Sequence, residues 1–155
     1  MSSGSSLLGL VSTLIVGIAA TYISWQQWKT NKLKLKLDLY DRRVRIYEVV
    51  KNTLQLVLKE SNVSPSDLSI FWTSASQADF LFGPEIPEYI DEIHKHGVRL
   101  HYWNSLLRAY NDSNQTPGNR SIEDVTNGMN EELLWFAKQF DPAREKFQKY
   151  LAMHN

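Results

Sequence analysis

The sequence predicts an all-α protein in which an N-terminal transmembrane helix continues into a cytoplasmic helical bundle. Three observations support this fold class. Residues 7–25 are apolar or small, later apolar residues recur at three- and four-residue spacings, and no alternating run has a comparable partner for a hairpin. Of the 155 residues, 43% are hydrophobic and 22% charged, which is ordinary for a folded protein.

The N-terminal apolar run, LLGLVSTLIVGIAATYISW, occupies residues 7–25 and carries no charge. As a helix it would extend about 28 Å, close to the thickness of a bilayer's hydrocarbon core. Aromatic and basic residues follow, and these favour the membrane–water interface. The expected interface residues are Trp25, Trp28, Lys29, Lys32, Lys34 and Lys36. Because lysine-rich flanks stay in the cytoplasm, we expect the N-terminus outside and the C-terminus inside.

Two other interpretations of this run remain open. A cleaved signal peptide would carry its basic residues before the apolar run, whereas here they follow it, although Gly17-Ile18-Ala19 could serve as a cleavage site. A helix buried in a globular core is the third interpretation. The Trp/Lys border and the lack of a polar face disfavour it.

Small residues recur at every fourth position of the apolar run. Gly9, Thr13, Gly17 and Thr21 would lie on one side of a helix. Such a face lets two membrane helices approach closely, but Gly and Thr are also common in bilayer helices generally. The pattern therefore indicates either a packing face for a second copy or ordinary membrane composition.

The stretch NKLKLKLDLY, residues 31–40, has leucine at every second position, which is typical of a half-buried strand. It lacks a hairpin partner, and neither Gly nor Pro interrupts residues 25–61, so we predict a helix over residues 29–60. The leucines then separate into two stripes. The second stripe, Leu35, Leu39, Ile46 and Val50, is a candidate association surface, to be covered by the chain's own domain or by another chain.

Capping signals divide the rest of the chain into helices. Ser64 followed by Pro65 predicts a helix over residues 65–73, and a short helix is expected over residues 77–82. Further helices are expected from Pro87, from Ser121 and near Pro142. The expected domains are an N-terminal segment, residues 1–28, and a cytoplasmic domain, residues 29–155, whose bundle occupies residues 64–153.

Two segments carry a resemblance to a known group of proteins. LYDRRVRIYE, residues 39–48, and FLFGPEI, residues 80–86, are similar to segments of uncharacterised small bacterial single-pass inner-membrane proteins with a helical cytoplasmic domain. The resemblance implies a bacterial inner-membrane location. It brings no catalytic residues with it.

No catalytic, cofactor-binding or metal-binding residues are predicted. The absence of cysteine excludes thiol catalysis and thiolate-bound metals. His94 and His101 share a helical face but lie about 10 Å apart along the axis, too far for one metal ion. Asp91 and His94 have the spacing found in helical di-iron sites, which need a second such motif that this sequence lacks.

Three functional hypotheses follow. The first is a non-enzymatic protein at the inner face of the membrane that acts by binding a protein partner or by forming homo-oligomers. The second is a membrane-perturbing effector, such as an antiphage-defence toxin, and the third is an enzyme with an unrecognised site near Asp91, His94 and Arg99. Basic residues predominate over residues 29–60 and acidic ones thereafter, which favours a lipid bilayer over nucleic acid as a partner.

Overall fold

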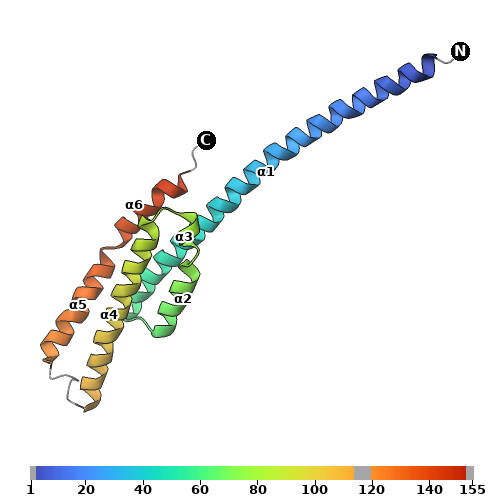
Figure 1. Ribbon diagram of the computed structural model, residues 1–155. Helices are drawn as coiled ribbons and strands as arrows, with labels where there is room; N and C mark the ends of the chain where they lie inside the picture. The colour runs from blue at the N-terminus through green and yellow to red at the C-terminus, as the bar shows by residue number, and fades with distance from the viewer. Residues whose placement is uncertain (1–2, 114–119, 153–155) are drawn as a thin grey trace. The chain divides into compact units, whose positions relative to one another are not determined.

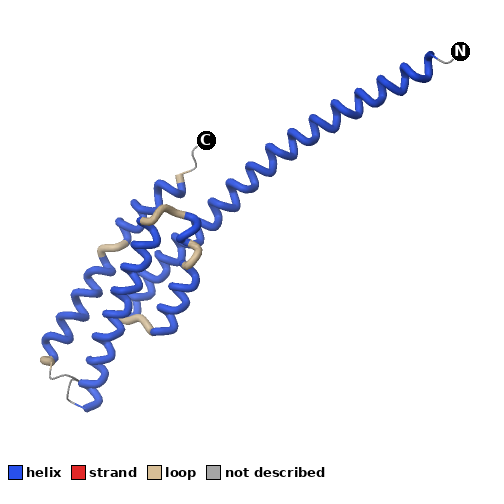
Figure 2. The backbone as a smooth tube through the Cα atoms, in the orientation of Figure 1, coloured by secondary structure: helices blue, strands red, loops and turns tan. Residues whose placement is uncertain are grey.

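Every described secondary-structure element of the computed structural model is an α-helix (Figures 1 and 2). The structure describes residues 3–113 and 120–152, with side chains from Thr13 onward except that of Ser113. The helices are α1 (Ser3–Glu60), α2 (Pro65–Ala75), α3 (Ala78–Leu81), α4 (Glu85–Ser113), α5 (Ile122–Ala137) and α6 (Phe140–Leu151). The all-α prediction is thus confirmed for these residues.

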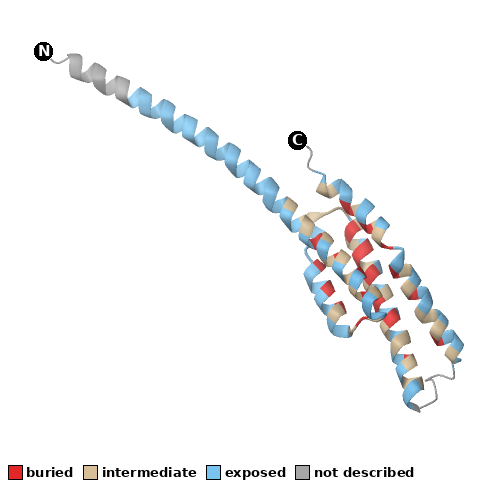
Figure 3. Cartoon of the chain, turned by 180° about the vertical axis from the view of Figure 1, so that it is seen from behind, coloured by how far each residue is buried: buried red, intermediate tan, exposed pale blue. Residues whose placement is uncertain are grey.

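The chain divides into two units, Met1–Tyr40 and Asp41–Asn155. In the first unit, every described side chain from Thr13 to Leu39 is exposed, as Figure 3 shows. The second unit contains the last part of α1 and all the other helices. The sequence had suggested a boundary after residue 28, whereas the structural division follows Tyr40.

The predicted transmembrane helix is corrected by the structure. Among the described residues, no helix has an apolar stretch long enough to cross a membrane. A transmembrane helix needs about 20 consecutive, predominantly apolar residues.

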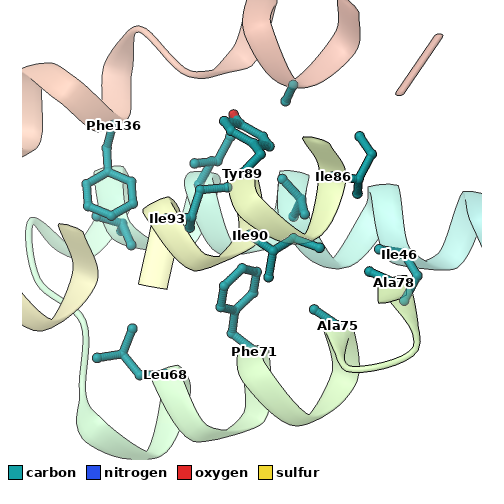
Figure 4. Packing of buried hydrophobic residues seen from close by; sticks show 14 of the residues in the cluster. Ile46, Leu68, Phe71, Ala75, Ala78, Ile86, Tyr89, Ile90, Ile93 and Phe136 are labelled. Atoms are coloured by element: carbon teal, nitrogen blue, oxygen red, sulfur yellow. The ribbon is translucent and has the colours of Figure 1, made fainter. Parts of the chain in front are cut away.

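Helix α4 lies at the centre of the Asp41–Asn155 unit, in contact with α2, α3, α5 and α6. Its fully buried residues Ile86, Ile93 and Leu100 belong to one hydrophobic cluster that draws on all six helices (Figure 4). From α1 the cluster takes Ile46, Val50, Leu54 and Val57, one stripe at helical spacing. The bundle is therefore built on two long helices, with the shorter helices covering them.

The N-terminal caps of α2 and α5 form as the sequence predicts. The Ser64 hydroxyl accepts a hydrogen bond from the Asp67 amide, and the Asp67 carboxylate accepts one from the Ser64 amide. Ser121 and Asp124 make the same reciprocal pair at α5. Aspartate therefore replaces the usual glutamate of a capping box at both helices.

Two large aromatic side chains of the bundle are exposed. Phe80 on the single-turn helix α3 is 89% exposed, and Trp72 on α2 is about half exposed. A helix as short as α3 buries only one side, and here Ala78 is the buried residue. Trp72 lies beside the His94 ring, with 4.9 Å between ring centroids.

A glycine permits the close approach of α4 and α5. A Cβ atom added at Gly128 would collide with the indole ring of Trp103, whose Cζ2 atom would be 2.7 Å away. The indole ring is rigid, so relief would require rotation of the whole side chain or separation of the helices. Gly128 is thus needed for packing rather than for a special backbone conformation.

We expect Gly128→Ala to destabilise the bundle. Overpacking typically costs about 1–3 kcal/mol, against a gain of up to about 1 kcal/mol from higher helix propensity. Chemical denaturation gives the free energy of unfolding. In a Trp103→Ala background the same glycine substitution should become neutral or stabilising, and an unchanged cost there would disprove the proposed collision.

Candidate functional site

The longest run of exposed apolar side chains among the described residues lies in the N-terminal segment, defined here as residues 13–39. Large apolar side chains are exposed along its whole length. They are Leu14, Ile15, Val16, Ile18, Tyr22, Ile23, Trp25, Trp28, Leu33, Leu35, Leu37 and Leu39. Soluble monomers rarely leave so large an apolar surface in water, so the segment is a candidate binding site.

Aromatic and basic side chains pair in the middle of this segment. The Lys29 ammonium lies 4.9 Å from the ring centroid of Trp25, and the Lys32 ammonium lies 3.7 Å from that of Trp28. Each pair spans one helical turn, and both rings remain about half exposed. Such contacts hold the lysine stems along the indole faces while leaving the ammonium groups hydrated.

The small-residue face predicted for helix packing is partly visible. The Thr21 hydroxyl donates to the Gly17 carbonyl over 2.8 Å, and a Cβ atom at Gly17 would meet no other atom within 4 Å. Thr13 is exposed on the same helix, whereas the predicted packing residue Gly9 lies outside the residues with described side chains. The structure therefore brings no second element onto this face within the described residues.

The candidate association stripe is divided between two environments. Leu35 is 70% exposed and Leu39 is also exposed, so both remain available to another molecule. Ile46 and Val50 are buried in the core of the Asp41–Asn155 unit. The chain's own domain therefore covers the later half of the stripe.

Arg43 donates hydrogen bonds to backbone carbonyls at the C-terminal ends of two helices. Its Nε donates to the carbonyl of Leu81, the last residue of α3, over 2.9 Å, and its terminal nitrogen donates to the carbonyl of Tyr150 near the end of α6 over 3.3 Å. Helix ends leave such carbonyls without helical partners and carry partial negative charge. The guanidinium also lies over the rings of Phe82 and Tyr150.

A carboxylate at the start of α4 completes this junction. Glu85 forms an ion pair with Lys149 and accepts a hydrogen bond from the Tyr150 hydroxyl over 2.5 Å. That hydroxyl in turn accepts from the Gly83 amide over 2.9 Å. Hydrogen bonds from Lys149 and then Tyr150 lower the pKa of Glu85 to about 2, and the same contact raises the pKa of Lys149. The charged pair is thus the favoured state at neutral pH.

A second polar cluster joins α4 to α5. The nearly buried Glu132 carboxylate lies 2.5 Å from the His96 Nδ1 and accepts from the Arg99 Nε over 2.8 Å. The His96 ring stacks on Trp135, with centroids 3.5 Å apart and planes 8° from parallel. Every side chain here is engaged with another in the same chain, so the cluster serves interhelical packing.

The three residues considered for an unrecognised enzyme site are not brought together. Asp91 pairs with Lys95, His94 lies against Trp72, and Arg99 binds Glu132. His101, which the sequence analysis considered as a metal ligand and set aside, interacts with the Val63 carbonyl at 3.0 Å. Among the described residues, no group of three potential ligands could hold a metal ion.

The junction residues were not singled out by the sequence. Arg43 stood between two other basic residues in a helix with acidic neighbours, and nothing local marked it as the one that faces inward. Its helical position, one turn before the partly buried Tyr47 and near the Ile46 stripe, was the available signal. Glu132 and Tyr150 gave no signal, because their partners are distant in sequence.

Comparison with known proteins adds no further constraint. No family model, no curated protein and no solved structure matches this chain. Its functional site must be argued from its own residues.

The Glu85 junction predicts an acid-sensitive contribution to stability. Because the folded-state pKa of Glu85 is lowered from 4.5 to about 2, its stabilising effect is complete above about pH 4.5 and is lost as the pH falls toward 2. We expect Glu85→Gln to flatten the fall in unfolding free energy over this window. Thermal unfolding measured across the pH range tests this, with the exposed Glu88→Gln as control; identical profiles for both variants would contradict it.

Arg43→Lys should loosen α3 and α6 without unfolding the bundle. Lysine keeps the charge but lacks the planar fork that reaches two carbonyls at once. Hydrogen exchange at the ends of α3 and α6 should accelerate together, while exchange in the middle of α4 is unchanged. The exposed Arg45→Lys is the matched control, and equal acceleration in both variants would show that Arg43 is not the contact responsible.

Proposed function

We propose that this protein acts by binding rather than by catalysis, as a helical protein that attaches to a membrane surface through its N-terminal segment. The helical bundle of Asp41–Asn155 would then be presented there to a protein partner. The observation that carries the proposal is that every large apolar side chain within residues 13–39 is exposed. The proposal concerns attachment to a lipid surface and makes no claim that the chain crosses it.

The hydrophobic effect supplies the driving force. Burial of apolar surface is worth about 25 cal/mol per Å², and one isoleucine side chain contributes roughly 1.5–3 kcal/mol when fully buried. The exposed residues Leu14, Ile15, Ile18 and Ile23 lie within three turns of one another. Embedding even part of this surface outweighs the cost of ordering the helix at the lipid interface.

Charge favours lipid over a second copy as the molecule that covers this segment. Four lysines occur over residues 29–36, and no acidic residue precedes Asp38. Two parallel copies in register would place these lysines against one another. A bilayer surface carrying anionic lipid instead attracts them.

The helical bundle also offers apolar side chains for a protein partner. Ile70 on α2, Phe80 on α3 and Leu134 on α5 are each more than half exposed. They are scattered singly over separate helices, as surface apolar residues commonly are. They support partner binding less strongly than the N-terminal segment supports membrane attachment.

Vesicle flotation of the full chain tests the proposal. The double variant Ile15→Ser/Ile18→Ser should weaken binding to phosphatidylcholine vesicles by about a hundredfold, because two apolar side chains lose their transfer free energy. Ile70→Ser removes an equally exposed isoleucine from the bundle and should bind as the unaltered chain does. A strictly monomeric chain that fails to float with vesicles would contradict the proposed function.

A further inference from the structure

The lysines that follow the apolar run are not equivalent on the helix. At roughly 100° per residue, Trp25, Trp28, Lys29, Lys32 and Lys36 fall within a sector of about 100°, here called the basic-aromatic face. Lys34 lies roughly opposite the middle of this face. Of the four lysines expected at the membrane interface, three therefore lie on one side of the helix, and Lys34 lies on the other.

The two cation–π contacts lie on this face. Lys29 reaches back over Trp25 and Lys32 over Trp28, so that each ammonium group lies near an indole ring one turn earlier. Both rings are exposed, 51% and 55% respectively, and the lysines are exposed as well. Amphipathic rings and ammonium groups are thereby held at neighbouring levels along the helix axis.

The composition of the face changes along its length. Toward the N-terminus it continues through Leu14 and Ile18, which are exposed and apolar, and through Thr21, and the exposed ring of Tyr22 lies at its edge. It then passes through the two tryptophans and ends in three lysines. This order, apolar then aromatic then basic, matches the change from acyl chains to headgroups across the surface of one leaflet.

The opposite side lacks this order. Gln27 and Thr30 flank Lys34 there, and Asp38 follows Lys34 by one turn. By contrast, none of Lys29, Lys32 and Lys36 has an acidic residue three or four positions after it. Local charge therefore distinguishes Lys34 from the other three lysines.

We propose that the basic-aromatic face binds the anionic phosphate headgroups of a lipid bilayer, with Lys29, Lys32 and Lys36 as the headgroup-binding residues. The inference rests on the proposed membrane attachment and adds to it a lipid class and a defined side of the helix. Charge complementarity identifies the occupant, and the tryptophans and preceding apolar residues favour a lipid surface over a water-soluble polyanion.

Binding of the full chain to two kinds of vesicle tests this inference. One kind is phosphatidylcholine alone, and the other is phosphatidylcholine mixed with phosphatidylglycerol. Lys36→Gln should weaken binding to the anionic vesicles about fivefold, and the triple glutamine variant of the face by on the order of a hundredfold. High salt should remove most of the difference between the two vesicle types.

Lys34→Gln is the matched control, since it removes the same charge only two residues from Lys36. It should weaken binding far less than Lys36→Gln, and circular dichroism should show the same helix content for both. Equal losses in the two variants would overturn the assignment of one face. Equal binding of the unaltered chain to both vesicle types would overturn headgroup recognition while leaving membrane attachment intact, and no binding to either would overturn both.

Discussion

Burial of one face of α4 is the constraint on which the rest of the bundle depends. Ile86, Ile93 and Leu100 are fully buried along this helix, and α2, α3, α5 and α6 all contact it. Helices as short as α2, α3 and α6 are marginally stable when isolated. The free-energy cost of helix nucleation offsets much of the stabilisation that their few hydrogen bonds provide. Their stability comes from apolar contact with α4 and with the Ile46 stripe of α1. A change in the α4 face would therefore affect every helix that rests on it.

Several polar contacts act at the ends of these helices, in addition to the Glu132 cluster between α4 and α5. Arg43 satisfies carbonyls at the ends of α3 and α6, and Glu85 binds Lys149 and Tyr150 where α4 begins. Tyr89 joins α4 to the start of α6 by donating to the Gln139 carbonyl, and burial raises the pKa of its hydroxyl. Apolar burial supplies most of the driving force, whereas these directional contacts determine how each short helix is aligned.

Patterns among neighbouring residues predicted the helices. Contacts between residues that are distant in the sequence were not predicted. The capping pairs at Ser64 and Ser121 lie within three residues, so the sequence alone revealed both. Arg43 and Tyr150 are separated by more than a hundred residues, and nothing in either neighbourhood indicates the other. The transmembrane prediction is contradicted, because no helix among the described residues has an apolar stretch long enough to cross a membrane. Asymmetry among the four lysines became evident only when the helix was established through Lys36.

The alternating leucines have a further consequence for the unfolded or partly folded chain. In the helix, Leu33, Leu35, Leu37 and Leu39 are distributed around the axis and exposed. If the segment became extended, the period of two would place all four on one side of a strand, which is the pattern of an aggregation-prone edge. Lys32, Lys34 and Lys36 would then occupy the other side and oppose stacking of identical chains by charge repulsion. In an extended chain the lysines would thus oppose the self-assembly into sheets that the aligned leucines favour.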